Sequence, residues 1–528
     1  MAKTYSVKKK ITWLGLDFGS SSTKAVGIVG ATGERVEFLF DPGYYPDGRI
    51  KTALKKSGDG FTLTTVVDIG KEGWDYCIKE NAVNPDGREK IKAFVIKYLH
   101  ALAGKEGGGF PKYDFDSVEA VCFGAPAYYK LKKEGNYLEN YKSYVTEAIE
   151  ESGVFGRCPR IISCPEPELA LRAYHAFVER ADKQSPLLGN GKNVLVVDVG
   201  GHTVDVVIMA SVYDGEKTSL VRIEENRPRS EDFNQRFPLG KYMTLHLADR
   251  LYGKRIFDPS LEVAKLQMLK SLDGLSDDEQ VDIFFTSALK EKVHFTRLET
   301  APEDKKPGET YVSLYGEDDR TSLCFGQTVE QCKGMVEACI HNGSIKIDNV
   351  LFTGGTSRIA LLREEIVGLI AFEPGNNGVR PEVLLMDDVK EDADGEPFLI
   401  GTLTECAVPL SSENAVATGA AIYAMGVQNG LIDQTDEYLG GSVSMQTDDP
   451  EKARLRAECD FYKCALDRSM TDEERLSFFA KYISLKRAMS DSPNIPPEGT
   501  ELREGQRRTE SIMIKVPTVY PKAPKKRF

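Results

Sequence analysis

The chain has 528 residues, more than one compact core usually holds, so we expect two or three domains. Hydrophobic residues make up 41% and charged residues 28%, which is typical of a folded globular protein rather than a disordered chain. The formal net charge of −13 argues against binding to nucleic acid or to anionic membranes, because a negative surface repels both. No apolar stretch is long enough to cross a bilayer, so we expect no membrane span and a cytoplasmic location.

The first predicted element is a strand, a turn and a second strand at residues 11–29. An apolar strand ends at Asp17, small polar residues follow, and the second apolar strand begins near Lys24. Such a turn leaves backbone N–H groups pointing outward, and small side chains let a phosphate approach them closely. Lys24 can add a positive charge at the same place. The candidate phosphate-binding residues are Gly19, Ser20, Ser21, Ser22 and Lys24.

Predicted helices and strands then alternate along the chain. We expect a helix at residues 89–102, a strand at 118–123 and an amphipathic helix at 141–152. Residues 159–174 are predicted to form a strand that turns into a helix. A polar, turn-rich stretch at 182–192 leads to the second half of the chain.

Residues 193–208 repeat the plan of residues 11–29. An apolar strand ends at Asp198, and the following turn supplies Gly200, Gly201, His202 and Thr203. His202 either contacts the terminal phosphate or caps the turn. A duplicated hairpin indicates two α/β lobes facing each other across a cleft, with Asp17 and Asp198 at its floor. Two carboxylates beside a triphosphate need a cation between them, and oxygen ligands suit Mg²⁺.

A third element at residues 349–359 is a strand, a double glycine and the start of a helix. Backbone without side chains at Gly354 and Gly355 lets a base or ribose lie against the chain, and Arg358 can stack on adenine. Residues 299–317 are charged and contain Pro and Gly, so we expect a loop there. Residues 449–490 are predicted to be helical, and the basic tail after residue 491 to be irregular.

Taken in order, these elements resemble the superfamily of actin, sugar kinases and heat-shock chaperones. The match is closest to the nucleotide-binding half of seventy-kilodalton heat-shock (DnaK-type) chaperones and covers roughly residues 11–428. Residues 198–206 look like the family's D-L-G-G-G-T-F-D-V, and residues 161–174 resemble R-I-I-N-E-P-T-A-A-A-L-A-Y. Residues 354–359 are similar to G-G-S-S-R-I, and residues 413–422 to E-A-V-A-Y-G-A-A-V. The Glu-Pro-Glu at 166–168 looks like the divergent, twelve-type branch.

The resemblance implies an α/β, two-lobed actin-like ATPase fold made of duplicated ribonuclease-H-like domains. Lobe I would comprise residues 1–186, and lobe II residues 187–428, with its last helix returning to lobe I. A C-terminal extension, helical and then disordered, would occupy residues 429–528. The implied activity is slow hydrolysis of ATP to ADP and phosphate with Mg²⁺.

The resemblance also implies residue roles. Asp17 and Asp198 would hold the water shell of Mg²⁺, while Asp205 and Glu166 would orient the attacking water. A catalytic lysine is expected near residues 84–85; Lys92 is our candidate and Lys90 the alternative, although a solvated position on an exposed helix fits either residue as well. With the turn residues above, the candidate ATP-binding set comprises Gly19, Ser20, Ser21, Ser22, Lys24, Gly200, Gly201, His202, Thr203, Lys292, Thr296, Gly354, Gly355, Thr356 and Arg358.

Three functions share this fold, and fold alone does not choose among them. We prefer an ATP-driven switch of the chaperone type, with a protein partner or client and without the family's β-sandwich substrate domain. The turn at residues 17–24 also resembles actin-type loops that carry a lysine, which makes a filament-forming ATPase the second candidate. A small-molecule kinase is the third, but it needs a base aspartate that we cannot identify. The sequence leaves the oligomeric state open.

Overall fold

The computed structural model describes residues 8–19, 22–41, 48–57, 60–63, 74–76, 82, 86–105, 109–126, 137–181, 192–200, 204–213, 218–225, 266–269, 282–286, 291–296, 309–313, 320–340, 345–386, 398–400, 407–408 and 410–429. Contacts between Cα atoms divide the chain into two units, Met1–Gly440 and Gly441–Phe528. The second unit lies outside the described residues, and so does the helical prediction for residues 449–490.

The first sheet is built around the hairpin predicted at residues 11–29. Its strand order is β10-β9-β1-β2-β3-β20-β21, while β4 also pairs with β2 and β8 with β1. β1 and β2 are antiparallel, and β9 and β10 run parallel to β1. The strands are β1 (Lys9–Phe18), β2 (Ser22–Val29), β3 (Arg35–Glu37), β4 (Ile50–Lys51), β8 (Tyr113–Asp114), β9 (Ala120–Ala125), β10 (Arg160–Pro165), β20 (Phe398–Ile400) and β21 (Ala407–Val408).

The second sheet repeats part of this arrangement. Its order, β13-β12-β11-β18-β19, matches β3-β2-β1-β9-β10 of the first sheet. β11 forms an antiparallel hairpin with β12, and β18 and β19 run parallel to β11. The repeated hairpins of the sequence therefore occupy equivalent places in two sheets. The strands are β11 (Asn193–Val199), β12 (Val204–Tyr213), β13 (Thr218–Glu225), β18 (Asn349–Thr353) and β19 (Glu382–Leu385).

Two smaller sheets complete the described strands. One has the order β6-β5-β7 and the other β14-β15-β16-β17. The expected loop at 299–317 is wrong in part, because β17 lies inside it, where Thr310, Tyr311 and Val312 favour a strand. The strands are β5 (Ala53–Ser57), β6 (Gly60–Leu63), β7 (Trp74–Tyr76), β14 (Leu266–Leu269), β15 (Asp282–Thr286), β16 (Glu291–Thr296) and β17 (Glu309–Ser313).

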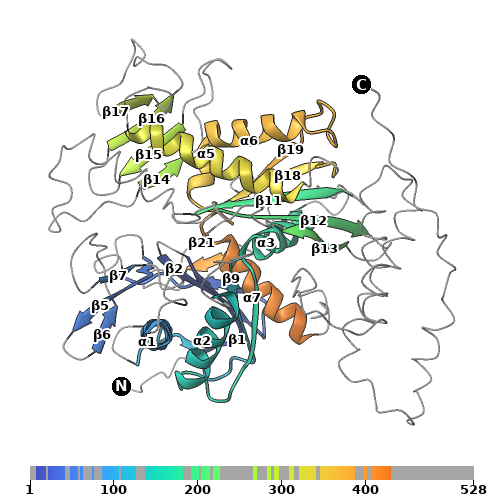
Figure 1. Cartoon of the computed structure of the whole chain (residues 1–528). Helices are drawn as coiled ribbons and strands as arrows, with labels where there is room; N and C mark the ends of the chain where they lie inside the picture. Colours follow the sequence, from blue (N-terminus) through green and yellow to red (C-terminus); the bar gives the residue numbers. More distant parts are fainter. Residues whose placement is uncertain are drawn as a thin grey trace, which may run out of the picture. The chain divides into compact units, whose positions relative to one another are not determined.

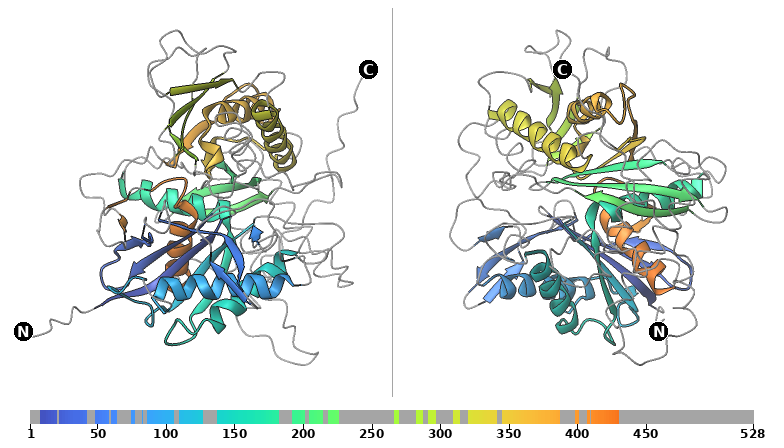
Figure 2. Two further views of the ribbon diagram at one scale, coloured as in Figure 1. Left: turned by 90° about the vertical axis from the view of Figure 1, so that its left-hand side faces the viewer. Right: turned by 45° about the vertical axis from the view of Figure 1, so that its right-hand side comes forward.

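Helices cover both faces of the two large sheets (Figures 1 and 2). α1 (Gly87–Ala103) and α2 (Tyr137–Glu151) pack on one face of the first sheet. α3 (Glu166–Ala181) and α7 (Ala415–Gln428) form a central layer whose core includes residues of both sheets. α5 (Arg320–Cys339) and α6 (Ala360–Phe372) cover the other face of the second sheet. The helices and strands predicted at 89–102, 118–123, 141–152 and 159–174 are confirmed as α1, β9, α2 and the pair β10–α3, whereas α5 was not predicted.

Alternation along the central strands explains this layering, because successive side chains of a strand point to opposite faces. In β1, Leu14, Leu16 and Phe18 belong to the core shared with α1 and α2. In β11, Val194 and Val196 belong to the core of the central layer, and the odd-numbered residues between and after them belong to the outer core with α5 and α6.

The central helices approach their neighbours closely through glycine. A Cβ atom placed on Gly15 of β1 would lie 2.1 Å from the carbonyl oxygen of Ala417 in α7. One placed on Gly419 of α7 would lie 1.8 Å from the carbonyl oxygen of Leu169 in α3. Both glycines are therefore required by backbone-to-backbone contact and not by an unusual dihedral angle.

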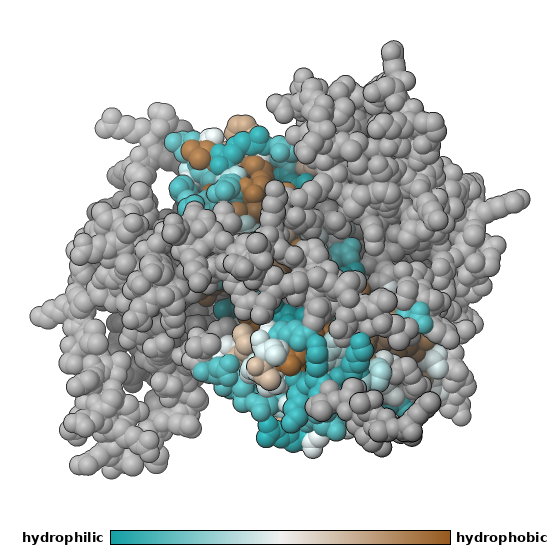
Figure 3. All heavy atoms as spheres, turned by 180° about the vertical axis from the view of Figure 1, so that it is seen from behind, coloured by the Kyte–Doolittle hydropathy of each residue, from teal (hydrophilic) through white to brown (hydrophobic). Residues whose placement is uncertain are grey.

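Within the described residues, no helix combines the length and the apolar character needed to cross a membrane. Seen from behind, the described surface is largely hydrophilic, with smaller hydrophobic areas (Figure 3). The large apolar side chains that the described part exposes are Phe372 (88%), Val379 (59%) and Val383 (37%). They lie near the end of α6 and on the edge strand β19.

Candidate functional site

The two hairpins present their aspartates to the same layer of the molecule. Asp17 follows Gly15 by two residues in β1, so it lies on the face that packs against α7. Asp198 follows Val196 by two residues in β11 and lies on the face that belongs to the central core. By the same alternation Lys24 of β2 and Asp205 of β12 share these faces. Four charged residues predicted from the motifs thus project toward the layer of α3 and α7.

Glu166 enters this layer from the start of α3. It directly follows β10, and only 6% of its surface is exposed. A Cβ atom on Gly124 would lie 2.9 Å from Cγ of Glu166, so the glycine makes room for the glutamate. Strands β1, β9 and β10 are parallel, which places Asp17, Gly124 and Glu166 at the same end of the sheet.

Asp17 and Lys24 form a direct ion pair. They are opposite each other in the register of β1 and β2, and Nζ of Lys24 lies 2.9 Å from Oδ2 of Asp17. Both side chains are largely shielded from water, with exposed fractions of 6% for Asp17 and 15% for Lys24. A Cβ atom on Gly19 would lie 3.0 Å from Nζ of Lys24 and 3.6 Å from Oδ1 of Asp17. The predicted phosphate turn therefore begins against this ion pair.

The double glycine lies beside Asp198. Gly354 has φ +83°, and a Cβ atom there would lie 2.4 Å from Oδ1 of Asp198 and 2.5 Å from the carbonyl oxygen of Val199. Glycine is thus needed twice over, for the left-handed backbone and for the close approach. Gly355 is exposed, and among the described residues no atom lies within 4 Å of a Cβ placed on it. The described part of the chain therefore leaves open space on that side of the turn.

A short 3-10 helix, η2 (Thr356–Arg358), connects this turn to the second hairpin. The hydroxyl of Thr356 donates to the carbonyl oxygen of Gly200 at 2.8 Å. The hydroxyl of Ser357 donates to the carbonyl oxygen of Gly354 at 2.8 Å. Thr356, predicted to contact the nucleotide, is therefore used in holding two predicted ligand turns together.

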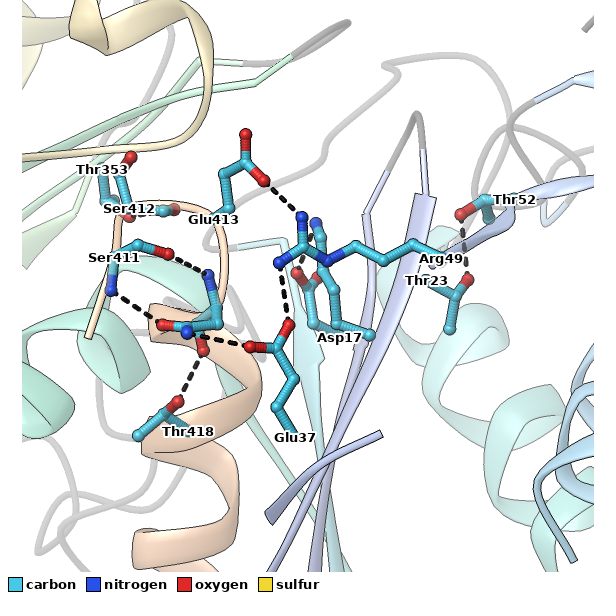
Figure 4. Close-up of polar contacts among 12 residues, drawn as sticks. Asp17, Thr23, Glu37, Arg49, Thr52, Thr353, Ser411, Ser412, Glu413 and Thr418 are labelled. Atoms are coloured by element: carbon cyan, nitrogen blue, oxygen red, sulfur yellow. Dashed lines mark hydrogen bonds and ion pairs between the residues drawn. The ribbon is translucent and has the colours of Figure 1, made fainter. Parts of the chain in front are cut away.

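Residues to which the sequence assigned no role in the site link the two sheets at this end (Figure 4). Thr353, which is opposite Asp198 in the register, donates to the carbonyl oxygen of Ser412 at 3.5 Å, the outer limit of a hydrogen bond. The neighbouring Glu413 pairs with Arg49, which also lies 2.8 Å from Glu37 of β3. These residues are far apart in the sequence and follow no period. The one available signal was the polar Ser411–Asn414 cap before a strongly apolar helix.

Several predicted residues cannot be placed at the site. Ser20, Ser21, Gly201, His202 and Thr203 lie outside the described residues. Lys292 and Thr296 are on β16, opposite Glu309 and Ser313 of β17, and Arg358 ends η2; only their backbones are described.

Lys92 has a different environment from the other predicted catalytic residues. It lies on α1, and its Nζ is 2.6 Å from Oε1 of Glu151 and 3.5 Å from Oε2 of Glu147, both on α2. The hydrogen bond to Glu151 is the main reason why the pKa of Lys92 is raised. A contact with phosphate would require the amine to leave these carboxylates. Catalysis by Lys92 stays a prediction.

The residues at the sheet ends suit a nucleotide carried with a hard cation. Asp17, Asp198, Asp205 and Glu166 offer carboxylate oxygens, Lys24 offers a cation, and Gly354 and Gly355 offer closely approachable backbone. Mg²⁺ is commonly held by one or two carboxylates and keeps several waters. In the described part of the chain, no three Asp, Glu, His or Cys residues gather as a ready-made metal site.

The comparisons with known proteins agree with the motifs. No family model matches the chain. The chaperone protein DnaK of Thermosipho africanus (strain TCF52B) is 24% identical over 315 residues, 59% of this chain and 45% of that protein. DnaK of Thermotoga neapolitana (strain ATCC 49049 / DSM 4359 / NBRC 107923 / NS-E) is 21% identical over 353 residues, 65% of this chain and 49% of that protein.

The chain thus spans about half the length of the curated relatives it matches. These matches support a distant relationship to the DnaK-type chaperones. The assignment to the twelve-type branch stays a prediction.

Proposed function

We propose that this protein is an ATP-binding and ATP-hydrolysing switch related to the DnaK-type chaperones. The observation that carries the proposal is the pair of equivalent hairpins. In each hairpin an aspartate, Asp17 or Asp198, lies one residue before the end of the first strand and faces the central layer. We further propose the two-lobed actin-like fold, with lobes at residues 1–186 and 187–428 and an extension at 429–528. We also propose that the protein binds a protein partner or client.

In this proposal each residue group has a distinct task. The turns after β1 and β11 bind phosphates through backbone N–H groups, and Lys24 adds a fixed positive charge. Gly354 and Gly355 let the nucleoside lie against bare backbone. Asp198 binds waters of a magnesium ion, which when bound neutralises phosphate charge. Glu166 and Asp205 accept hydrogen bonds from the attacking water and orient it, which is the kind of positioning that accelerates phosphoryl transfer.

Ligand-dependent unfolding tests the binding half of the proposal. MgATP should raise the unfolding temperature, because a ligand at a hundredfold excess over Kd adds about 2.7 kcal/mol to the native state. ATP in EDTA should raise it less. Asp198→Asn should lose most of the magnesium-dependent part, whereas Asp116→Asn, a change at an exposed aspartate, should behave as the wild type. If no nucleotide shifts the transition, the proposal is refuted.

Hydrolysis tests the catalytic half. Asp198→Asn and Glu166→Gln should each lower the rate about 10²–10³-fold, the usual effect of losing one electrostatic group at a reacting centre. Phosphate release measured under saturating ATP gives the rate. A loss of tenfold or less in both variants would place the chemistry elsewhere.

A filament-forming ATPase is the second candidate. The observation that favours it is the exposure of three apolar side chains, Phe372 and Val379 near the end of α6 and Val383 on the edge strand β19. Exposed apolar residues next to unpaired strand edges can mediate contacts between copies of a chain.

A further inference from the structure

The two equivalent hairpins carry different cross-strand pairs at their ends. In the first, Asp17 is opposite Lys24, and in the second, Asp198 is opposite Asp205. All four side chains lie on faces that turn to the central layer. The first pair has no net formal charge, and the second has two negative formal charges. The hairpins match in topology but differ in electrostatics.

The first pair is already compensated within the protein. The 2.9 Å ion pair gives the buried carboxylate of Asp17 a cation in the absence of any ligand. Removing one partner of a buried pair leaves an uncompensated charge, which is strongly unfavourable. A metal ion that took Lys24's place on Asp17 would have to displace this amine. A metal ion at Asp198 and Asp205 would meet two carboxylates in register.

The amine of Lys24 can donate hydrogen bonds to Asp17 and to a second acceptor at the same time. An ammonium group has three donors, and the ion pair with Asp17 occupies one direction. Gly19, the first residue of the predicted phosphate turn, lies directly against Nζ. The same amine can therefore remain on Asp17 and face an anion in the turn.

We propose, on the basis of the function proposed above, that the two aspartates have different roles. Asp17 is a positioning residue that holds Lys24 as a permanent cation for the phosphates. The divalent cation belongs to the second hairpin, through Asp198 as proposed above. Lys24 of the first hairpin then neutralises part of the phosphate charge of the nucleotide without a metal ion.

ATP titrations of the full chain, in EDTA and in excess Mg²⁺, give two dissociation constants for each variant. Lys24→Met and Asp17→Asn should weaken ATP binding about tenfold or more in both media, because each removes or misplaces a charged hydrogen-bond donor. The ratio of the dissociation constant in EDTA to that in excess Mg²⁺ should stay as in the wild type. Asp198→Asn should bring that ratio close to one, and Lys24→Arg should keep most of the metal-free affinity. If Asp17→Asn lowers the ratio as far as Asp198→Asn does, Asp17 holds the metal and the inference is wrong.

A second measurement needs no nucleotide. The unfolding free energies of Asp17→Asn, Lys24→Met and the double variant form a thermodynamic cycle. The double variant should lose less stability than the sum of the single losses, because it leaves no charge without a partner. Additive losses would overturn the positioning role even if ATP binds. If the wild-type chain binds ATP in neither medium, the proposed function fails and the phosphate role of Lys24 falls with it, whatever the cycle shows.

Discussion

Arg49 joins parts of the chain that are remote in sequence. Its Nη2 lies 2.8 Å from Oε1 of Glu37, and its other terminal nitrogen pairs with Glu413. Glu37 also accepts a hydrogen bond from Nδ2 of Asn414 at 3.0 Å. Glu37 is 1% exposed, so water cannot replace the guanidinium if it is removed. The arginine therefore holds the start of α7 to β3.

Arg49→Met should destabilise the protein by about 3–5 kcal/mol, the usual cost of removing one partner of a buried ion pair. The matched control is Arg157→Met, whose ion pair with Glu119 is mostly exposed (69% and 38%). That change should cost about 0.5 kcal/mol or less. Urea unfolding of both variants gives the comparison. Equal losses of unfolding free energy would mean that burial does not increase the contribution of the Arg49 ion pairs to stability.

At the scale of elements, a row of ion pairs connects α1 and α2. Arg88 lies 2.6 Å from Glu147, and Lys92 lies 2.6 Å from Glu151. The hydrogen bond from Arg88 lowers the pKa of Glu147. A carboxyl with a lowered folded-state pKa stabilises the protein above its ordinary pKa and loses that contribution as the pH falls through the lowered value. The Arg88–Glu147 pair should therefore weaken as the pH falls into the acid range.

Lys92→Met separates a structural role from a catalytic one. If Lys92 only joins the two helices, the unfolding temperature should fall by about 2 °C or less and nucleotide hydrolysis should be unchanged. We expect this result because its amine is already paired with α2. Lys90→Met, which removes the pair with Asp86 on the same helix, is the control. A large loss of hydrolysis at unchanged stability, confined to Lys92→Met, would return this residue to the catalytic set.

The contact between α3 and α7 depends on Gly419. A Cβ atom there would lie 1.8 Å from the carbonyl oxygen of Leu169, so Gly419→Ala must push the helices apart. We expect a loss of about 1–3 kcal/mol or more, as for other overpacked cores. Gly368→Ala on α6 is the matched control, since no atom of the part of the chain that the structure describes lies within 4 Å of its added Cβ. That change should raise stability by roughly 0.4–1 kcal/mol because alanine favours helix. Thermal or urea unfolding distinguishes the two, and a neutral Gly419→Ala would contradict the close packing.

At the scale of the whole molecule, the test is whether ATP changes a conformation or an assembly. A nucleotide that contacts groups from both large sheets differs in affinity between conformers, and this difference is what shifts a population. We expect MgATP to change the pattern of limited proteolysis while light scattering stays flat. Scattering that rises with protein concentration and falls as ATP is consumed would favour the filament. Phe372→Ser, at the most exposed large apolar side chain of the described residues, should then suppress it.

The sequence predicted the local positions of several candidate site residues. Asp17, Asp198 and Gly354 each belong to a strand end with a recognisable turn, so motif and alternation were enough to locate them. The Arg49 cluster was missed because Glu37, Arg49 and Glu413 are 12 and 364 positions apart and meet only through tertiary packing. The pairing of β20 with β3 was missed for the same reason. The Asp17–Lys24 contact could have been found by counting across the hairpin, since the turn fixes which residues are opposite.

The place of α7 has a consequence for how the protein is made. β1 begins at Lys9, but the helix that covers its inner face ends only at Gln428. Until that helix has left the ribosome, the face of β1 that it covers stays open, and contacts so distant in sequence form late. The nascent chain therefore presents an open hydrophobic surface for most of its translation.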